Sequence, residues 1–566
     1  MTGAEAILDF LQRQHVYKVF GYPGGAIMPL YDALLDFDIK HYLARHEQGA
    51  GFAAIGYARS TNKPGVCFGT SGPGFTNLLT PLADAMLDSV PLLVISGQVA
   101  SASMGSDAFQ EVDSLGLSLS VTKHSFQITH PDEIPEVMEQ AYALCMSGRP
   151  GPVLVDVPKD ILMSEVTEQA FLQATHPAAK NEPSYGEALA QANDLLASAA
   201  RPLLYLGGGI AMADALTEAR QYIKMTGLPL VSSLKGLGTA PPDYPLDQGM
   251  LGMHGLRPAN MAVNECDLLL VMGARLDDRA TGKLAEFAPS ARVIHIDIDA
   301  AELGKRRQPD VSINADIKCI FNQLFTEFEV PDWLQRIEML QAQGQPCNAD
   351  QQGDEQKGLS AEAVLSALNT ATGGKAIYTC DVGQHQMWAA QYLKFASPRH
   401  HLTSGGLGTM GFGLPAAMGA QAANPDATVV TISGDGSFMM NIQELATAIR
   451  YDLPVKVVLF DNQRLGMVKQ WQELFHEQRF SETDLSDNPP FTDIARGFGF
   501  YACELTHGDN IDAVVAQLIE QKGPALLHVK LNPQDNVWPI VPPNTGNAQM
   551  LEQQMVEKKM TEQQYD

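Results

Sequence analysis

The sequence predicts an α/β protein with three doubly wound parallel-sheet domains. The chain has 566 residues, which at roughly 150 residues per domain indicates three or four domains. Short runs rich in Val, Ile and Leu alternate with helix-like stretches along almost all of the chain. Strands that are apolar along their whole length are typical of parallel sheets, because helices cover both faces of such sheets. Two polar stretches divide this pattern into three units.

The predicted strands are short, and several of them end in Gly, Ser or Asp, residue types that favour turns. In chain order they are residues 16–20, 66–69, 92–96, 153–156, 203–206, 268–272, 293–298, 428–432 and 455–460. A further short strand-like stretch covers residues 41–44, and the chain begins with the pattern of a helix.

The two polar stretches are typical of linkers between domains. The first lies near residues 175–185, and the second, near residues 341–357, is rich in Gln. The domains predicted from them are residues 1–175, 186–340 and 358–540, followed by a polar tail at 541–566. The two outer domains are similar in size, which is compatible with an old duplication.

The balance of charges excludes some partners. Lys and Arg number 38 against 65 Asp and Glu, which gives a net charge of −27. Such a chain repels a nucleic-acid backbone and an anionic membrane, so we expect neither as a partner. An anionic ligand would have to be bound locally, by backbone N–H groups, a metal or a few fixed cations.

The cysteines and the apolar runs indicate a compartment. The seven Cys are scattered and no C-x-x-C pair occurs, so neither a disulfide framework nor a thiolate zinc site is expected. No apolar run approaches the ~20 residues of a membrane span, and the N-terminus lacks the pattern of a signal peptide. We therefore expect a reduced, soluble, cytoplasmic protein.

The most specific motif consists of two strand ends separated by a helical stretch. Residues 431–437 read TISGDGS, and residues 457–462 read VVLFDN. If the two strands form a right-handed βαβ unit, their carboxyl ends lie side by side, where α/β sheets bind ligands. Asp435 and Asn462 would then meet as oxygen donors suited to Mg²⁺, and the glycines would let the backbone approach a phosphate. The alternative is a plain glycine turn capped by an Asp.

A single helix is predicted for residues 438–451, between the two strands. Apolar residues recur there at helical spacing, at Met439, Ile442, Leu445 and Ile449. The whole arrangement resembles the GDG…NN signature of thiamine diphosphate (ThDP) enzymes. The first Asn of that signature corresponds to Asp461 here, while the second, the metal ligand, is retained as Asn462.

An enzyme of the ThDP class also needs a carboxylate that exchanges a proton with the aminopyrimidine ring of the coenzyme. Glu47 follows the strand-like stretch 41–44 and opens a helix of small apolar residues. Taken alone, Glu47 is more readily interpreted as a helix cap. Together with the metal motif, a catalytic role is the better interpretation.

Four segments extend the resemblance to one family. They are GYPGGA at 21–26, RHEQGA at 45–50, DAFQE at 107–111 and GGLGTMGFG at 405–413. These segments resemble the large, catalytic subunit of acetohydroxyacid synthase (acetolactate synthase), and DNQRLGMV at 461–468 is similar to the bacterial isozyme II form. The resemblance implies an N-terminal pyrimidine-binding domain, a central FAD-binding domain and a C-terminal domain for the diphosphate and Mg²⁺.

The resemblance also implies an active site between two subunits, with Glu47 from one chain and Asp435 and Asn462 from the other. The catalytic residues that it implies are Glu47, Gly25, Gln110 and Lys159. The implied ThDP contacts are Glu47, Val382, Gly383, Gln384, His385, Gly408, Met410, Gly434, Asp435, Gly436, Ser437, Asn462, Gly466 and Met467. The implied metal ligands are Asp435, Asn462 and the carbonyl of Arg464. The implied substrate pocket consists of Phe109, Met467, Val468 and Trp471.

The central domain contains segments that resemble the FAD-contacting segments of the family. A GGG turn at 207–209 follows a predicted strand, although such a turn alone is a weak motif. Arg275 and Arg279 suit a diphosphate or a carboxylate because guanidinium groups bind both in bidentate fashion. The alternatives are a hydrogen-bonded loop histidine for His254 and a strand-end turn for Asp297. The implied FAD contacts are Arg149, Gly207, Gly208, Met253, His254, Gly255, Gly273, Ala274, Arg275, Asp277, Arg279, Asp297, Ile298 and Asp316.

The implied activity joins two 2-oxo acids. Pyruvate loses CO₂ on ThDP, and its two-carbon unit is ligated to a second pyruvate, giving 2-acetolactate, or to 2-oxobutyrate, giving 2-aceto-2-hydroxybutyrate. Both products lead to branched-chain amino acids. Because the reaction has no net redox step, FAD is interpreted as mainly structural. Two alternatives stay open: a flavin-dependent pyruvate oxidase or other ThDP decarboxylase, and a non-catalytic paralogue.

The family also implies partners for the chain. These are a second copy, in a homodimer or a dimer of dimers, and a small regulatory subunit. No segment of this chain is typical of an effector site, so feedback by branched-chain amino acids would belong to the regulatory subunit. Trp471 is expected to favour the longer acceptor, since burying an extra methyl group against its ring is worth ~1 kcal/mol.

Overall fold

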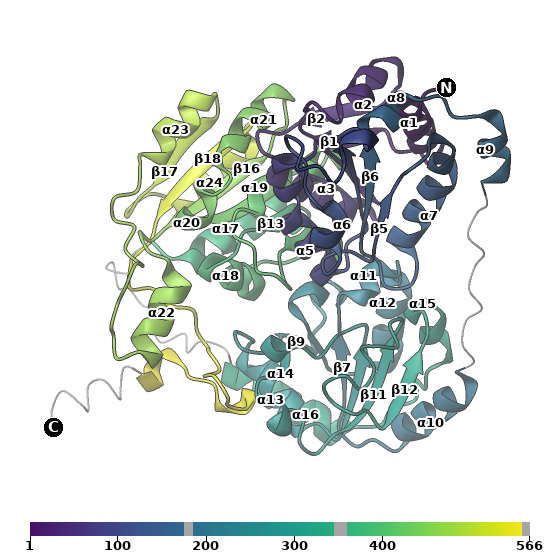
Figure 1. Cartoon of the computed structure of the whole chain (residues 1–566). Coiled ribbons are helices and arrows are strands. Elements are labelled where there is room, and N and C mark those ends of the chain that lie inside the picture. The colour runs from purple at the N-terminus through teal and green to yellow at the C-terminus, as the bar shows by residue number, and fades with distance from the viewer. Residues whose placement is uncertain (175–184, 345–358, 557–566) are drawn as a thin grey trace.

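The computed structural model describes residues 1–174, 185–344 and 359–556. In these ranges the chain forms three six-stranded sheets whose strands pair in parallel (Figure 1). In Figure 1 the first sheet (purple to blue) and the third (green to yellow) lie next to each other above the central sheet (teal). The predicted fold class is confirmed. The predicted linkers and the end of the tail fall largely outside the described residues, although α16 continues to Gly344.

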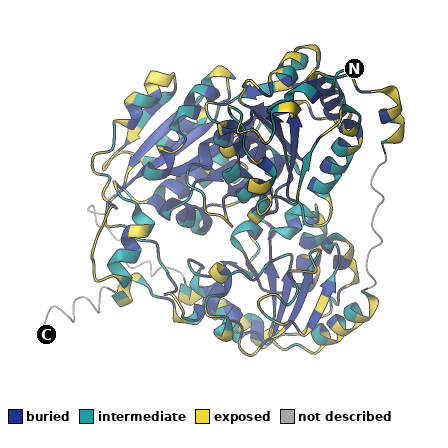
Figure 2. Ribbon diagram, viewed as in Figure 1, coloured by how far each residue is buried: buried dark blue, intermediate teal, exposed yellow. Residues whose placement is uncertain are grey.

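The first sheet has the strand order β2-β1-β3-β4-β6-β5. Its strands are β1 (Lys18–Gly21), β2 (Lys40–Leu43), β3 (Gly65–Gly69), β4 (Leu92–Gln98), β5 (His124–Gln127) and β6 (Pro152–Pro158). The helices around it are α1 (Gly3–Arg13), α2 (Met28–Ala33), α3 (Glu47–Thr61), α4 (Pro73–Thr76), α5 (Leu79–Asp88), α6 (Ser114–Ser118), α7 (Ile134–Met146), α8 (Lys159–Met163) and α9 (Glu168–Gln173). The strands β3, β4 and β6 are buried throughout because both faces of the sheet are covered (Figure 2).

The central sheet has the order β12-β11-β10-β7-β8-β9. Its strands are β7 (Pro202–Leu206), β8 (Leu230–Ser232), β9 (Asp247–Met250), β10 (Leu268–Met272), β11 (Arg292–Asp297) and β12 (Val311–Asn314). Its helices are α10 (Gly186–Ala197), α11 (Gly209–Met212), α12 (Leu216–Thr226), α13 (Arg257–Glu265), α14 (Asp278–Thr281), α15 (Ile317–Ile320) and α16 (Pro331–Gly344). Counted from its own first strand, this is the 3-2-1-4-5-6 order of dinucleotide-binding folds, which reverses between β7 and β10.

The third sheet has the order β14-β13-β15-β16-β18-β17, which repeats the order of the first sheet strand for strand. Its strands are β13 (Ile377–Cys380), β14 (His401–Thr403), β15 (Val429–Gly434), β16 (Lys456–Asp461), β17 (Tyr501–Leu505) and β18 (Ala525–Lys530). Its helices are α17 (Ala361–Thr372), α18 (Gln384–Tyr392), α19 (Gly413–Ala423), α20 (Asp435–Phe438), α21 (Leu445–Arg450), α22 (Gly466–Phe475), α23 (Phe491–Phe498) and α24 (Ile511–Glu520). A shared strand order is what a duplication of one unit would leave.

The first and third units meet through α3 and α19, two helices built largely from small residues. A Cβ added at Gly56 would lie 2.1 Å from the carbonyl oxygen of Ala416, and one added at Gly419 would lie 1.8 Å from that of Ala53. Glycine is therefore required where the two backbones approach. The apolar residues of both units merge at this contact into one core cluster.

The predicted strands are all present, with ends that differ from the predicted ones by at most two residues. The single helix predicted for residues 438–451 is wrong, because the segment forms α20, the 3₁₀ turn η9 (Ile442–Glu444) and α21. Asn441 interrupts the helix with φ −134° and ψ 28°. Its side-chain amide donates to the carbonyl oxygen of Gly411 at 2.7 Å, an alternative to helical hydrogen bonding that Asn readily adopts.

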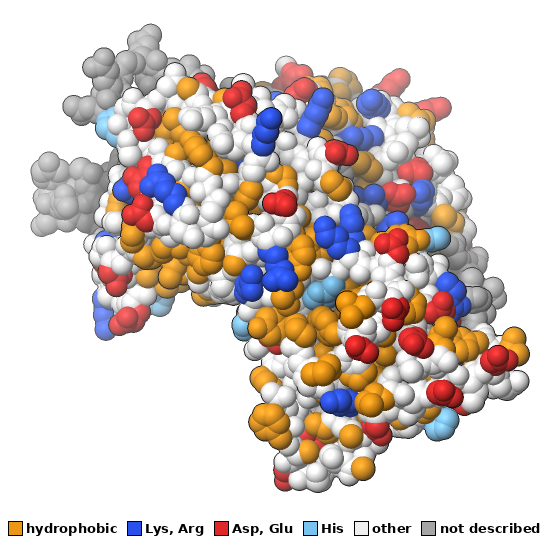
Figure 3. Space-filling view, turned by 90° about the horizontal axis from the view of Figure 1, so that it is seen from above, with side chains coloured by type: hydrophobic (Ala, Val, Ile, Leu, Met, Phe, Trp, Pro, Cys, Tyr) orange, Lys and Arg blue, Asp and Glu red, His pale blue; other side chains and the backbone are white. Residues whose placement is uncertain are grey.

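The surface, the cysteines and the helices add three observations. On the face drawn in Figure 3, acidic and basic side chains are interspersed among apolar ones. Six cysteines lie in the described ranges and are free thiols, while Cys347 lies outside them. Among the described residues, no helix has both the length and the apolar character that crossing a membrane requires.

Candidate active site

The third sheet brings the predicted diphosphate and metal residues to the carboxyl ends of three neighbouring strands. The strand β15 pairs with β13 on one side and with β16 on the other. Val382 and Gly383 follow β13, Asp435 follows β15, and Asn462 follows β16. The strand order reverses between β13 and β15, and such a reversal is where doubly wound sheets bind ligands.

The two predicted metal ligands present oxygen donors at this edge. Asp435 is 3% exposed, and its Oδ2 accepts a hydrogen bond from the amide of Asn488 at 2.8 Å rather than from a basic side chain. Burial, and then the charge of Asp461, raise the pKa of Asp435 to about 7. Asn462 donates its Nδ2 to Oε1 of Gln384 at 2.9 Å, which fixes its amide. A buried carboxylate next to another carboxylate and an amide oxygen is a donor set that fits Mg²⁺.

A cavity of about 100 Å³ lies between these strand ends and the start of α22. A Cβ added at Gly434 would lie 2.6 Å from Nδ1 of His385, and one added at Gly466 would lie 1.9 Å from Oε1 of Gln384, so glycine keeps the cavity open. Nε2 of His385 is buried with no hydrogen-bond partner among the described residues, and burial lowers the pKa of this histidine to about 3. Such a cradle fits a diphosphate. The predicted ThDP residues on its wall are Val382, Gly383, Gln384, His385, Met410, Gly434, Asp435, Gly436, Ser437, Asn462, Gly466 and Met467.

A larger cavity of about 810 Å³ adjoins the first, a volume in the range of pockets for sizeable organic ligands. It includes the place where the central strand order reverses, since Gly208 follows β7 and Gly273 follows β10. The predicted FAD residues on its wall are Arg149, Gly208, Met253, His254, Gly273, Ala274, Arg275, Asp277, Arg279, Asp297, Ile298 and Asp316. The residues predicted for ThDP or substrate that line it are Val382, Gly383, Gly408, Met410, Met467, Val468 and Trp471.

Two predicted FAD residues, Gly207 and Gly255, are not on the wall of this cavity. A Cβ added at Gly207 would lie 2.0 Å from the carbonyl oxygen of Gly273, where the loops after β7 and β10 cross. One added at Gly255 would lie 2.4 Å from the backbone of Leu251. Both glycines are explained by close backbone packing behind the wall.

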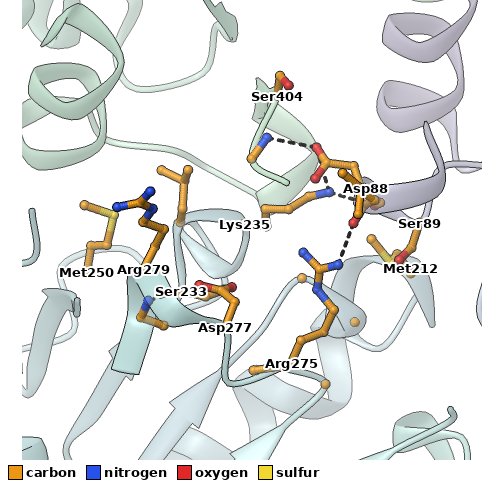
Figure 4. A pocket seen from close by; sticks show the side chains of 18 of the residues that line it. Asp88, Ser89, Met212, Ser233, Lys235, Met250, Arg275, Asp277, Arg279 and Ser404 are labelled. Atoms are coloured by element: carbon orange, nitrogen blue, oxygen red, sulfur yellow. Dashed lines mark hydrogen bonds and ion pairs between the residues drawn. The ribbon is translucent and has the colours of Figure 1, made fainter. Parts of the chain in front are cut away.

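The polar side chains of the larger cavity fit a dinucleotide such as FAD. Nδ1 of His254 is buried, and no group in the described part of the chain forms a hydrogen bond with it; burial lowers the pKa of this histidine to about 4. Arg149 is paired with Glu302 at 2.8 Å, whereas Arg279 is more exposed and has a longer ion pair, at 3.7 Å, with its neighbour Asp278. Both side chains lie at the larger cavity, and Figure 4 labels Arg279 there. The unpartnered nitrogen and the strand order are the observations on which this fit rests.

All three units meet around Asp88, at one wall of the larger cavity (Figure 4). Its carboxylate pairs with Nζ of Lys235 at 3.0 Å and accepts hydrogen bonds from the backbone N–H groups of Gly405 at 3.1 Å and Gly406 at 2.8 Å. Burial lowers the pKa of Lys235 to about 7, against the opposing effect of Asp88. These contacts hold the loop that leads to Met410 against the first unit.

The first sheet gathers a second group of predicted residues where its own strand order reverses, between β1 and β3. Glu47 is 9% exposed at the start of α3, and a Cβ added at Gly74 would lie 3.4 Å from its Oε1. A Cβ added at Gly72 would lie 2.9 Å from Cα of Gln110, whereas the space around Gly25 is open. Glu47, Gly25 and Gln110 therefore lie at the same edge of the sheet.

The first-sheet group is separate from the two cavities in the single chain. Arg149, between α7 and β6, is the predicted residue of the first unit that lines the larger cavity. The other five, Glu47, Gly25, Phe109, Gln110 and Lys159, line neither cavity. Phe109 is 88% exposed, and Lys159, at the start of α8, is partly exposed. One chain thus carries two separate groups of predicted site residues.

Comparison with known proteins gives the same division of the chain. Residues 1–117 match the model of the thiamine pyrophosphate enzyme N-terminal TPP binding domain, residues 189–324 the central domain and residues 381–529 the C-terminal TPP binding domain. The acetolactate synthase isozyme 2 large subunit of Escherichia coli strain K12 is 51% identical over 98% of the chain and 100% of its own length. The chain belongs to the family of acetolactate synthase large subunits.

Two further relatives show how widely this large-subunit family extends. The isozyme 1 large subunit of Escherichia coli strain K12 is 47% identical, with 97% of each chain covered. A protein described as a probable acetolactate synthase large subunit in Methanocaldococcus jannaschii is 42% identical over 100% of the chain and 98% of its own length. Thiamine diphosphate is the cofactor that the N- and C-terminal domain models name.

The structure of this large-subunit homologue also reveals polar groups that the sequence did not single out. Asn77 contacts Glu47, Asn488 bridges Asp435 and Asp461, and Glu444 binds the N–H groups that precede Glu47. Asn77 and Asn488 lie in loops or at helix ends where local periodicity carries no signal. The Gly-Pro-Gly turn after β3, at the carboxyl end of a strand, is the one feature that could have pointed to Asn77.

Proposed function

We propose that the chain is the catalytic subunit of an acetolactate synthase. It would convert two molecules of pyruvate into 2-acetolactate and CO₂, and pyruvate plus 2-oxobutyrate into 2-aceto-2-hydroxybutyrate and CO₂, in branched-chain amino-acid biosynthesis. The observation that carries the proposal is the full-length similarity to acetolactate synthase large subunits. The domain limits 1–175, 186–340, 358–540 and 541–566 belong to the proposal.

The proposal includes three cofactors, each with residues that suit it. ThDP would bind through the glycine-lined cavity beside His385, with Mg²⁺ held by Asp435, Asn462 and the carbonyl of Arg464. FAD would occupy the larger cavity, where Arg279 is available for its diphosphate. When bound, ThDP supplies an acidic carbon and an electron sink for the electron pair left by decarboxylation.

The chain's own residues would hold the reactants and move protons. The carboxylate of Glu47 would take up and return a proton at the aminopyrimidine ring, and the open space at Gly25 leaves its backbone N–H available to a carbonyl oxygen. Gln110 would position the donor, with Phe109 beside it and Lys159 near the entrance. Met467, Val468 and Trp471, on one helix, would contact the side chain of the acceptor.

The partners and compartment complete the proposal. Because Glu47 and Asp435 belong to separate groups in one chain, we infer a homodimer, or a dimer of dimers, whose active site takes Glu47 from one subunit and Asp435 from the other. The relatives are named large subunits, which supports a small regulatory subunit as a further partner. A cytoplasmic location fits the free thiols.

Product analysis tests the proposal directly. The purified protein is incubated with pyruvate and 2-oxobutyrate, with ThDP, Mg²⁺ and FAD each present or omitted. We expect both acetohydroxy acids, and loss of product when ThDP or Mg²⁺ is omitted. Formation of acetate with reduction of the flavin at a matching rate would identify a pyruvate oxidase instead, and no turnover in any mixture would favour a non-catalytic paralogue.

A further inference from the structure

Glu47 has a side-chain partner to which the resemblance assigns no role. Nδ2 of Asn77 donates a hydrogen bond to Oε2 of Glu47 at 2.9 Å. Among the hydrogen bonds of the described residues, this is the contact that reaches the Glu47 carboxylate itself. The other carboxylate oxygen, Oε1, lies beside the backbone of Gly74, where an added Cβ would be 3.4 Å from it.

The backbone fixes Asn77 in this position. It ends the short helix α4, and its N–H donates to the carbonyl oxygen of Pro73 at 3.1 Å. Gly72, before this helix, has φ +58°, a conformation that glycine tolerates without strain. The Asn77 side chain is partly buried, and Leu78, next to it, is fully buried. The amide is thus held toward Glu47 by structure on both sides.

The other ionisable groups near Glu47 come from different elements. Tyr31 on α2 and the thiol of Cys67 on β3 have pKa values raised chiefly by burial, so both are neutral through the physiological range. Glu444 on η9 packs against Gly49, two residues after Glu47 in α3, and burial raises its pKa as well. Within the described ranges none of these groups has a hydrogen bond to the Glu47 carboxylate, which leaves the Asn77 amide as the side-chain donor that contacts it.

We propose that Asn77 is a positioning residue for Glu47, whose amide holds Oε2 and leaves Oε1 to exchange a proton with the coenzyme. This inference rests on the proposed role of Glu47. Proton exchange requires the carboxylate to be charged and aimed in one direction, and a neutral N–H donor serves both needs. An acidic residue at position 77 would instead compete with Glu47 for its proton.

A graded series of variants tests the proposal in the assembled, cofactor-loaded protein. N77A removes the donor, while N77D keeps the shape and adds a carboxylate beside Glu47. We expect the acid limb of the pH profile of kcat/KM for pyruvate to move to higher pH in both variants. In N77A the shift should be about one pH unit, which corresponds to the free energy of one charge-assisted hydrogen bond. In N77D the shift should be larger, because a second carboxylate is added. The pH at which ThDP binding weakens, measured calorimetrically with Mg²⁺ present, should move in the same order.

Thr76 supplies a matched control at the neighbouring position. Its side chain is exposed, and its hydroxyl bonds the carbonyl oxygen of Pro73 rather than Glu47, so T76A should leave both pH profiles in place. Unmoved profiles in N77A and N77D would overturn the role of Asn77. If N77A does not fold, the isosteric N77D decides. A parallel E47Q variant separates the two proposals, because full turnover in E47Q removes the proposed role of Glu47 itself.

Discussion

Two buried carboxylates, Glu47 and Asp435, have surroundings that suit different tasks. Asp435 lies near a second acid, Asp461, and its pKa is raised to about 7, as expected for a site that a divalent cation would stabilise. Glu47 has an amide donor on one oxygen, and its other oxygen lies beside the backbone of Gly74. The first environment fits metal binding and the second fits proton transfer.

Replacing Glu47 by Gln tests the proton-transfer role at the scale of one atom. E47Q keeps the volume and one hydrogen-bonding oxygen but cannot take up a proton. We expect kcat to fall by roughly 10²- to 10⁴-fold at saturating ThDP, the usual contribution of a general acid–base group, while the melting temperature stays within a few degrees of the wild type. Steady-state kinetics and calorimetric unfolding check the two parts, and unchanged turnover would contradict the assignment.

Replacing Trp471 by Leu tests acceptor selection. Trp471 lines the larger cavity, and loss of its ring should lower the preference for 2-oxobutyrate over pyruvate about fivefold, corresponding to ~1 kcal/mol for one methyl group. The product ratio in competition between the two acceptors measures the effect. Phe475 packs edge-on against Trp471 at 5.4 Å but lines neither cavity, so F475L is the control that should keep the ratio.

At the scale of elements, the contact between α3 and α19 depends on the absence of side chains. In G419V the new Cβ would lie 1.8 Å from the carbonyl oxygen of Ala53. Two methyl groups attached to that Cβ would add to the overlap. We expect a loss of roughly 1–3 kcal/mol or more in the free energy of unfolding, as for overpacked cores. Chemical denaturation with both far-ultraviolet and fluorescence detection measures the change.

Gly497 offers the matched control within a helix. It lies in α23, and a Cβ added there meets nothing within 4 Å. G497A should therefore stabilise the protein slightly, by about 0.5–1 kcal/mol, because alanine restricts the unfolded chain and favours the helix. Equal effects of G419V and G497A would show that the α3–α19 contact carries no special steric demand.

The same elements show what the sequence can and cannot predict. The buried strand β10 is a continuous apolar run and is located residue for residue, whereas the edge strands β5 and β17 mix polar and apolar residues and are not predicted. Also absent from the predicted strands are β8, β9, β12, β13, β14 and β18, although β13 and β18 are largely buried. The broken helix was missed because apolar periodicity does not register the hydrogen bond from Asn441 to a distant loop. Asp435 and Glu47 could be found from motifs, but Asn77 becomes visible only when the turn after β3 is placed beside α3.

At the scale of the whole molecule, the first and third sheets share one strand order, and each has predicted site residues at its own carboxyl edge. Glu47 lies at the edge of the first sheet and Asp435 at the edge of the third sheet. Each edge fits one end of an elongated coenzyme, so two copies of the chain would provide two complete sites. The central sheet, with its different strand order, supplies the dinucleotide-type cavity beside them.

Mixing two inactive variants tests this arrangement. E47Q and D435N should each be inactive alone, yet a dimer that contains one of each keeps one site in which both residues are wild type. Random assembly of equal amounts should restore about a quarter of wild-type turnover, because half of the dimers are mixed and each has one active site. Turnover after co-expression, with the dimer composition verified by differential tags, measures the recovery. A site contained within one chain would give no recovery.

The carboxylate of Glu444 accepts the backbone N–H groups of Arg45 at 3.0 Å and His46 at 3.1 Å, directly before Glu47, and lies in the segment that begins with Asp435. In a subunit-spanning dimer these two ends serve opposite reaction centres. One short rigid bridge would therefore couple them mechanically, so that the first centre to fill alters the shape of its twin.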